Sequence, residues 1–342
     1  NMFLVLCWLE TGSKREQIKI MKYRHLGKQG LQVSEIALGS WMTDVSDAKA
    51  QDLAAQSIKL AYENGVNFFD CADAYSGGAA ERFLGKALKQ YDRKELIISS
   101  KVYFPTGDGI NDRGLSRKHI FESVDQSLKN LQTGYLDLYF AHRFDPETPL
   151  EEALQAMSDL IDQEKILYYG VSEWRPVPVL AAQLVIQKLG LHPMSVVQPQ
   201  YNMFDRYIEH ELIDVCDKLG LGIVPFSPLS QGLLTGKYRK GQPIPAGSRA
   251  TYQDQIQALL TDENLDKVEA LIKMADRLDT DLATFALAWT LRKPQITSLI
   301  TGASKPAQLK NNLKALDLVI PESYFKQIDE LFGFEKFSRV IG

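Results

Sequence analysis

The sequence is poor in cysteine, and the few cysteines that it has are far apart. Its 342 residues contain three, Cys7, Cys71 and Cys216. An odd, widely spaced set argues against a disulfide framework, and the sequence has no Asn-x-Ser/Thr acceptor site for N-glycosylation. We therefore expect a reducing compartment, with the cytoplasm as the default.

The sequence also lacks a charge excess and a long hydrophobic run. Its formal net charge is −4, with 24% charged and 45% hydrophobic residues, which is ordinary for a soluble globular protein. This balance leaves no basic footprint for nucleic acid, and the apolar stretch at residues 2–9 is far too short to span a bilayer. We expect no nucleic-acid partner and no direct membrane insertion, and we assign no metal site.

The first twenty residues differ from the rest of the chain. They begin with Asn1, they lack the positively charged start of a signal peptide, and Met21 follows them. We interpret residues 1–20 as a disordered, tag-like or upstream N-terminal extension. Residues 21–342 then form the folded domain.

Within that domain, eight short apolar runs alternate with helical patterns, and no Gly/Ser/Pro-rich linker divides them. Eight strand and helix units favour a single (β/α)8 TIM barrel of the α/β class over an open doubly wound sheet. The expected strands are residues 36–41, 66–71, 96–102, 136–142, 168–174, 195–201, 222–228 and 296–301. The expected helices are residues 50–64, 80–91, 117–131, 150–165, 179–189, 209–219, 264–278, 282–292 and 307–316.

Two segments lie outside this alternation. Residues 23–33 contain two strand-like pieces around a glycine-bounded turn, which predicts an N-terminal β-hairpin that plugs one end of the barrel. Residues 232–261, after the seventh strand, contain four glycines and prolines between 241 and 247 and no clear periodicity. Long irregular loops are usually functional or mobile, so we interpret this one as a lid.

Four polar residues lie at or just past neighbouring strand ends. Asp70, Lys101 and His142 end the second, third and fourth runs, and Tyr75 follows the second. Active sites of such barrels form at the carboxyl ends of the strands. The set suits carbonyl reduction, because a general acid must neutralise the charge that develops on the oxygen, and a lysine beside a tyrosine lowers the pKa of the phenol.

In this hypothesis Tyr75 donates the proton and Lys101 lowers the pKa of the Tyr75 phenol. Asp70 holds the lysine in place, because Asp70 shares a strand face with Phe68 and needs a cation there. His142 orients the substrate oxygen or shares the proton. Each residue also has a structural alternative: an ion pair at strand ends, a packed tyrosine or a core histidine. A barrel isomerase or aldolase with Lys101 as a Schiff-base amine needs an unpaired lysine, and Asp70 argues against it.

Several motifs together resemble the aldo-keto reductase family over roughly residues 21–331. They are FDCADAY at 69–75, SK at 100–101, AHR at 141–143, GVS at 170–172, QYN at 200–202 and SPLSQGLLTGKY at 227–238. Within the family, RGLSRKHI at 113–120 and SEW at 172–174 most resemble the branch of the voltage-gated potassium channel β subunits and their bacterial relatives. The resemblance implies a (β/α)8 barrel, NADPH/NADP+ as the cofactor, and a catalytic tetrad at Asp70, Tyr75, Lys101 and His142.

The residues and the resemblance both indicate where a dinucleotide binds. No Gly-x-Gly-x-x-Gly follows a strand and no Gly-x-x-x-x-Gly-Lys-Ser/Thr occurs, so neither a Rossmann nor a P-loop site is supported. Barrels tend to bind phosphate at the loops after strands seven and eight, where Gly302, a capping Ser304 and Lys305 precede a helix. Lys305 and Arg249 could hold a ribose 2′-phosphate, which favours NADPH over NADH.

Further contacts are implied by the resemblance alone. Ser172 and Gln198 would hold the nicotinamide amide, and Phe226 would stack on its ring. Ser304 and Gln308, taken by themselves, also fit ordinary helix capping and a solvated helix face. The remaining implied contacts are Ser227, Leu229, Gly232 and Lys237 to the pyrophosphate, and Gln308 and Asn312 to the adenosine.

Side chains at or just beyond the strand ends are the expected substrate contacts: Trp41, Tyr103, Phe104, Arg143 and Trp174. An apolar mouth suits an aldehyde or ketone with a hydrophobic or small polar body. Both tryptophans have an alternative interpretation as packing at the barrel rim.

Two departures from the family pattern bear on activity. Glu173 stands where the channel subunits carry Arg, and His142 stands where animal channel subunits carry Asn. The second favours an enzyme over a regulatory subunit. We therefore expect an NADPH-dependent reductase of aldehydes or ketones. The alternative is an NADP(H)-binding regulatory β subunit of a potassium channel with little turnover, and the resemblance also allows a homo-oligomer.

Overall fold

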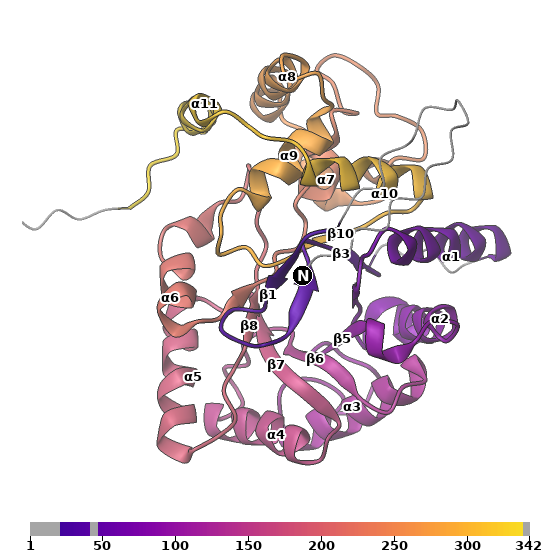
Figure 1. The fold of residues 1–342 in the computed structure, drawn as a ribbon, viewed down its shortest axis with the longest axis vertical. Coiled ribbons are helices and arrows are strands. Elements are labelled where there is room, and N and C mark those ends of the chain that lie inside the picture. Colours follow the sequence, from indigo (N-terminus) through magenta and orange to yellow (C-terminus); the bar gives the residue numbers. More distant parts are fainter. Residues whose placement is uncertain (1–20, 42–46, 338–342) are drawn as a thin grey trace, which may run out of the picture.

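The barrel is formed by one sheet of eight parallel strands, in the order β10-β3-β4-β5-β6-β7-β8-β9 (Figure 1). The computed structural model describes residues 21–41 and 47–337, so the predicted extension at 1–20 lies outside the described residues. The sheet closes between β9 and β10, where the Thr297 N–H bonds the Ile223 carbonyl at 2.7 Å and the Ile300 N–H bonds the Pro225 carbonyl at 3.0 Å. The strands are β3 (Ile36–Gly39), β4 (Phe68–Asp70), β5 (Ile97–Val102), β6 (Leu136–Ala141), β7 (Ile166–Ser172), β8 (Val196–Gln198), β9 (Gly222–Ile223) and β10 (Leu299–Thr301).

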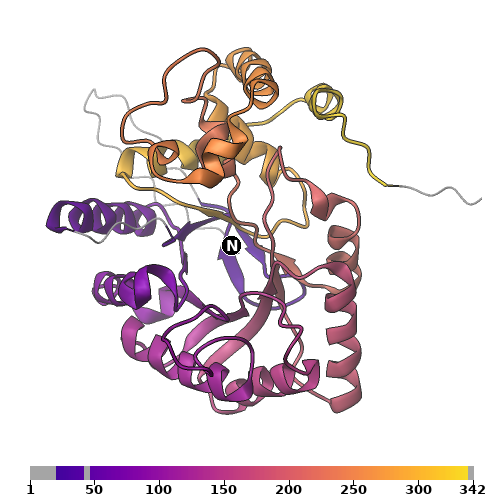
Figure 2. The ribbon, with the colours of Figure 1, turned by 180° about the vertical axis from the view of Figure 1, so that it is seen from behind.

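Helices surround this sheet, as the view from behind also shows (Figure 2). Polar side chains start several of them: Asp47 accepts a hydrogen bond from the Ala50 N–H, and Ser116 accepts one from the His119 N–H. The helices are α1 (Ala48–Glu63), α2 (Ala79–Leu88), α3 (Arg117–Leu131), α4 (Leu150–Asp162), α5 (Pro176–Leu189), α6 (Leu212–Leu219), α7 (Asp254–Leu259), α8 (Asp262–Asp276), α9 (Leu282–Leu291), α10 (Pro306–Asn312) and α11 (Glu322–Phe332).

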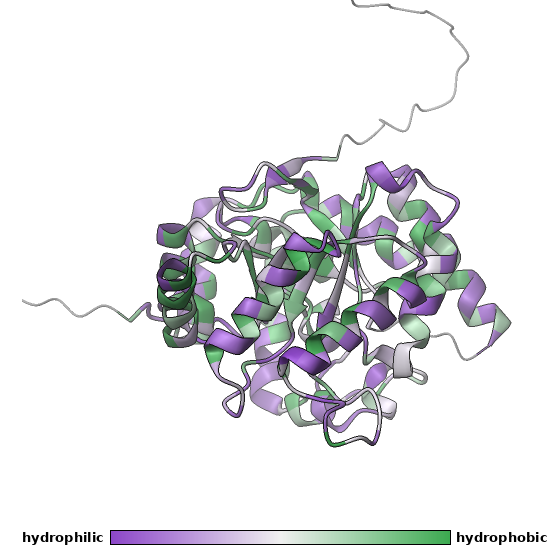
Figure 3. Cartoon of the chain, turned by 90° about the horizontal axis from the view of Figure 1, so that it is seen from below, coloured by the Kyte–Doolittle hydropathy of each residue, from purple (hydrophilic) through white to green (hydrophobic). Residues whose placement is uncertain are grey.

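Most helices carry hydrophilic and hydrophobic residues side by side, as expected for helices with one face on the barrel (Figure 3). Helix α9 differs, because every one of its residues is buried. Within the described parts of the chain, no helix is both long and apolar enough to cross a membrane.

The predicted N-terminal hairpin is confirmed, and it closes one end of the barrel. Strands β1 (Tyr23–His25) and β2 (Gln32–Ser34) pair antiparallel, and they lie across the middle of the barrel in Figure 1. Leu26 and Val33 are fully buried in the cluster that fills the barrel interior, together with Phe68 and Phe140. Since Phe68 points inward, Asp70, two residues later on β4, points inward as well.

Two helical features were not predicted. The long connection at 232–261 is present, but it is not irregular throughout, because the 3-10 turns η4 (Ser230–Thr235) and η5 (Arg249–Thr251) and helix α7 lie in or beside it. Helix α11 was not predicted, although Phe325, Ile328 and Leu331 have helical spacing and Pro321 precedes its first turn.

Candidate active site

A buried ion pair lies at the centre of the site. Strands β4 and β5 are neighbours in the sheet, and the Lys101 ammonium lies 2.7 Å from Asp70 Oδ2. It also donates to the Cys71 carbonyl at 2.5 Å, while Asp70 Oδ1 accepts from the Ser99 hydroxyl at 2.8 Å and from Gln198 Nε2 at 3.1 Å. Both charges are therefore paired and hydrogen-bonded, which is what makes burial of an ion pair tolerable.

This pairing sets the protonation state of Lys101. Burial by itself would lower the pKa of its ammonium, but the Asp70 carboxylate, together with Tyr75 and Cys71, more than offsets burial, and the net pKa is raised. The lysine is a cation at neutral pH. A Schiff-base amine has to be neutral and unpaired, so this geometry argues against the isomerase or aldolase alternative.

Tyr75 lies above the ion pair, with its ring centroid 5.0 Å from Lys101 Nζ. It begins the 3-10 turn η1 (Tyr75–Gly78), in which Ser76 adopts a left-handed φ of 49° and the chain turns sharply towards α2. Burial raises the pKa of the Tyr75 phenol, and Lys101 lowers it by less. The expected net lowering of this pKa is therefore wrong for this structure, and the phenol is protonated at neutral pH, as a proton donor must be.

His142 completes the group from the end of β6. Its ring packs edge-on against Tyr75, with centroids 5.8 Å apart, and against Phe104 at 4.9 Å. Burial, and then the nearby cations Lys101 and Arg143, hold the pKa of His142 well below 6.5, so the imidazole is neutral. Its buried Nδ1 has no hydrogen-bond partner among the described residues. The structure thus brings together all four residues of the predicted tetrad.

A second buried polar cluster lies on the helix side of β5, and the sequence interpretation missed it. Asp73 accepts hydrogen bonds from the Ser123 hydroxyl and the Ala74 N–H, both at 2.6 Å. Glu81, fully buried on α2, accepts from the Ser100 hydroxyl at 2.6 Å and from an asparagine amide on α3. Burial raises the pKa of Asp73 to about 7. The available signal was a second acid, three residues after Asp70, in an otherwise apolar stretch.

The loop after β9 has a strained backbone. Ser227, Ser230 and Gln231 have left-handed φ angles of 52°, 46° and 54°, and Gly232 follows with a φ of 102°. Such strain collects at functional sites, and runs of turns of this kind can present N–H groups to an anion. A Cβ on Gly232 would lie 3.1 Å from the ammonium of Lys237, so the glycine lets this exposed cation approach the turn.

Two predicted cofactor contacts are buried polar side chains without partners among the described residues. They are Ser172 Oγ, at the end of β7, and Asn312 Nδ2, at the end of α10. A buried group of this kind normally finds a hydrogen bond, so these atoms fit contacts to a bound dinucleotide. Gln198 is already engaged with Asp70, while Phe226 is half-buried at the barrel interior.

The loop before α10 differs from its prediction. Lys305, not Ser304, is the N-cap residue of the helix, and Gln308 Oε1 accepts hydrogen bonds from the Ser304 N–H at 2.8 Å and hydroxyl at 3.0 Å. These contacts match the capping alternative. Gly302, Ser304, Lys305 and Gln308 are all exposed, while the half-buried Leu229 packs against the outer core.

The predicted substrate residues differ in their packing and exposure. Tyr103 and Phe104 pack edge to face at 5.3 Å, and the Arg143 guanidinium lies 5.2 Å from the Phe104 ring. Trp41 is half exposed, and the Arg249 guanidinium lies 5.5 Å from its ring. Trp174 is only 1% exposed, so its burial fits the packing alternative better than substrate contact.

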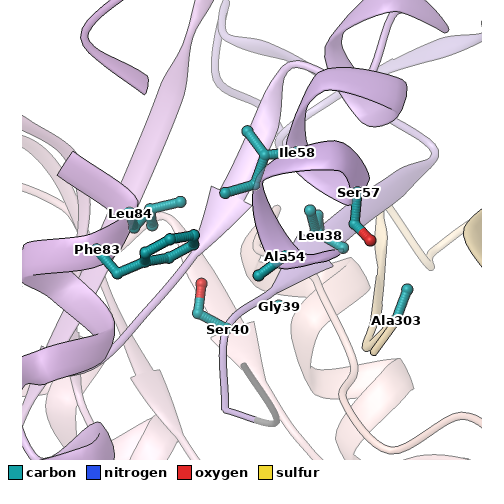
Figure 4. A pocket seen from close by; sticks show the side chains of 9 residues that line it. All are labelled: Leu38, Gly39, Ser40, Ala54, Ser57, Ile58, Phe83, Leu84 and Ala303. Atoms are coloured by element: carbon teal, nitrogen blue, oxygen red, sulfur yellow. The ribbon is translucent and has the colours of Figure 1, made fainter. Parts of the chain in front are cut away.

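A small pocket lies apart from the tetrad, between α1 and α2 (Figure 4). Apolar side chains such as Ile58, Phe83 and Leu84 form most of its wall, with Ser40 and Ser57 as its hydroxyl groups. None of the four tetrad residues lines it. The pocket is therefore separate from the tetrad.

Comparison with known proteins agrees with this geometry. The model of the aldo/keto reductase family matches residues 35–332. The chain is 40% identical over 310 residues to a probable voltage-gated potassium channel subunit beta of Oryza sativa subsp. japonica, covering 87% of this chain and 92% of that protein. It is 39% identical over 329 residues to a putative voltage-gated potassium channel subunit beta of Schizosaccharomyces pombe, covering 93% and 95%. The chain belongs to the aldo/keto reductase family.

Proposed function

We propose that the chain is an NADPH-dependent oxidoreductase that reduces aldehydes or ketones to alcohols. The observation that carries the proposal is the buried Asp70–Lys101 pair, 2.7 Å between its charged atoms, directly beneath the Tyr75 ring. Its free, buried cysteines Cys71 and Cys216 are compatible with a reducing compartment such as the cytoplasm.

Each residue of the tetrad has a separate part in this reaction. Tyr75 gives its phenol proton to the carbonyl oxygen as negative charge develops there. Lys101 stabilises the phenolate that is left, since its cation lowers the pKa of the phenol against the effect of burial. Asp70 fixes the position of the lysine, and the neutral His142 is placed beside Tyr75 to orient the substrate oxygen.

The proposed cofactor would supply the hydride when bound. Ser172 and Asn312 offer it buried polar atoms that have no partner in the described part of the chain, and Gly232 and Lys237 offer a turn and a cation to its pyrophosphate. Arg249 and Lys305 are our proposed contacts to the 2′-phosphate. Replacing both by Ala should weaken NADPH binding far more than NADH binding, measured by fluorescence titration; an equal loss for both cofactors contradicts this part.

A second candidate follows from the names of the relatives, which describe potassium channel β subunits. In that case the chain would bind the dinucleotide and a channel but turn over little. His142 favours the enzyme, because it adds a group able to orient a substrate oxygen. The two candidates differ in turnover, so NADPH consumption with a panel of aldehydes, including 4-nitrobenzaldehyde and methylglyoxal, separates them. Tight NADPH binding without consumption supports the subunit.

A further inference from the structure

Arg143 is a cation beside the candidate site that has no carboxylate partner among the residues that the structure describes. It follows His142 directly at the end of β6 and is partly exposed. Its Nη1 donates to the His142 carbonyl at 2.6 Å. Over residues 21–41 and 47–337, the contacts of its guanidinium are this carbonyl and the Phe104 ring, and no carboxylate forms an ion pair with it. Most of its donor groups are therefore open to a ligand.

Two carboxylates, Asp145 two residues further along the chain and Glu173, which interacts electrostatically with Arg143, are engaged with backbone groups. Asp145 accepts a hydrogen bond from the Leu115 N–H at 2.8 Å. Glu173 accepts one from the Gln200 N–H at 2.6 Å, and its left-handed φ of 59° holds it in a conformation that few residues other than glycine adopt. Burial raises the pKa of the Glu173 carboxyl, and the Arg143 guanidinium lowers it by less. The two charges therefore interact electrostatically without forming an ion pair.

The guanidinium has a defined position relative to the proposed acid. The rings of Tyr75 and His142 lie 5.8 Å apart, those of His142 and Phe104 lie 4.9 Å apart, and the Arg143 guanidinium lies 5.2 Å from the Phe104 ring centroid. Stacking on an aromatic ring restricts a guanidinium and leaves its edge free for hydrogen bonds. The cation is thus held two rings away from the phenol that would protonate a carbonyl.

We propose that Arg143 binds the carboxylate of the substrate, and that the preferred substrates are aldehydes that carry a carboxylate at the end opposite to the reacting carbonyl. The guanidinium fork matches a carboxylate in geometry and charge, and it forms stronger hydrogen bonds than a neutral donor. The negative charge of Glu173 would repel a substrate carboxylate that approached Arg143 from the Glu173 side. The carboxylate would therefore bind the edge of the guanidinium that lies over Phe104. This inference rests on the proposed carbonyl reduction.

The test compares 4-carboxybenzaldehyde with its methyl ester, methyl 4-formylbenzoate, which has the same ring and aldehyde but no charge. The ratio of the two kcat/KM values is measured for the wild type, Arg143→Gln, Arg143→Lys and Lys188→Gln. The wild type should prefer the carboxylate. Arg143→Gln should reduce the ratio roughly tenfold to a hundredfold, as for loss of a charged hydrogen bond, with most of the change in KM. Arg143→Lys should keep part of the preference.

Lys188→Gln is the matched control, since it removes one positive charge from an exposed position in the last turn of α5. It should keep the wild-type ratio, and an equal fall in this variant would mean a long-range charge effect and overturn the inference. An unchanged ratio in Arg143→Gln, with turnover of the ester, overturns the inference and leaves the proposed function standing. If the wild type reduces neither aldehyde, the proposed function fails and the inference with it.

Discussion

Strand β5 separates two groups of buried acids that have different partners. On the barrel side, Asp70 is paired with the Lys101 ammonium at 2.7 Å. On the helix side, Asp73 and Glu81 receive hydrogen bonds from hydroxyl and amide groups and from a backbone N–H, and neither has an ion pair within the described ranges. Burial of an acid is therefore compatible with two roles. A buried acid paired with a cation can fix the position of a group that sets the pKa of a reacting side chain. A buried acid that accepts hydrogen bonds from neutral donors can link the helices to the strand.

The largest effect should follow from breaking the pair on the barrel side. Asp70→Asn leaves the Lys101 charge buried without its counter-charge, which typically costs about 3–5 kcal/mol. We expect a fall of this size in the free energy of unfolding, measured with urea, together with loss of aldehyde reduction.

The matched control replaces both partners, as Asp70→Asn with Lys101→Met. Because neither charge of the pair is then present, we expect this double variant to regain much of the stability while remaining inactive. A single Asp70→Asn variant as stable as the wild type would mean that the lysine does not depend on this carboxylate.

The next effect concerns the helix side, where Asp73 should make the free energy of unfolding depend on pH. Asp73 has a folded pKa of about 7 against its ordinary value of 3.8, so the folded state binds its proton more tightly than the unfolded state does. The free energy of unfolding should therefore fall as pH rises from about 4 to 7. Asp73→Asn should flatten this dependence in urea titrations between pH 4 and 8.

Asp108→Asn is the control for this comparison, since Asp108 is exposed on the loop after β5. It should keep the wild-type pH dependence of stability. If Asp73→Asn keeps that dependence too, another group is responsible for it.

The smallest effects should come from the adjacent serines on β5. Ser99 donates to Asp70 inside the barrel, and Ser100 donates to Glu81 outside it. Each change to Ala should cost about 1–3 kcal/mol of stability, because a buried acceptor loses a donor. Steady-state kinetics should show a lower kcat for Ser99→Ala and an unchanged kcat for Ser100→Ala. Equal effects on kcat would erase the distinction between the two sides of the strand.

The fold and the tetrad could be predicted because both depend on local patterns. Strand-length apolar runs ending in Asp70, Lys101 and His142 place those residues at one end of a parallel barrel. Their proximity then follows from topology alone.

The helix-side cluster could not be predicted in the same way. Asp73 and Glu81 meet their donors through the packing of α2 and α3 on β5, and no local pattern specifies that contact. The direction of the Trp174 ring also depends on its neighbours, because the same spacing allows a buried or an open side chain. The pKa of Tyr75 was predicted in the wrong direction, because the effect of burial can be judged only from the folded environment.

The most direct test of the account is the turnover of Tyr75→Phe beside that of Tyr91→Phe. The Tyr91 hydroxyl is buried without a partner in the described structure and lies outside the tetrad, so it is a matched removal of one hydroxyl. We expect Tyr75→Phe to reduce NADPH consumption with 4-nitrobenzaldehyde by about 10²–10⁴-fold while NADPH still binds, and Tyr91→Phe to keep the wild-type rate. Wild-type turnover by Tyr75→Phe would contradict it.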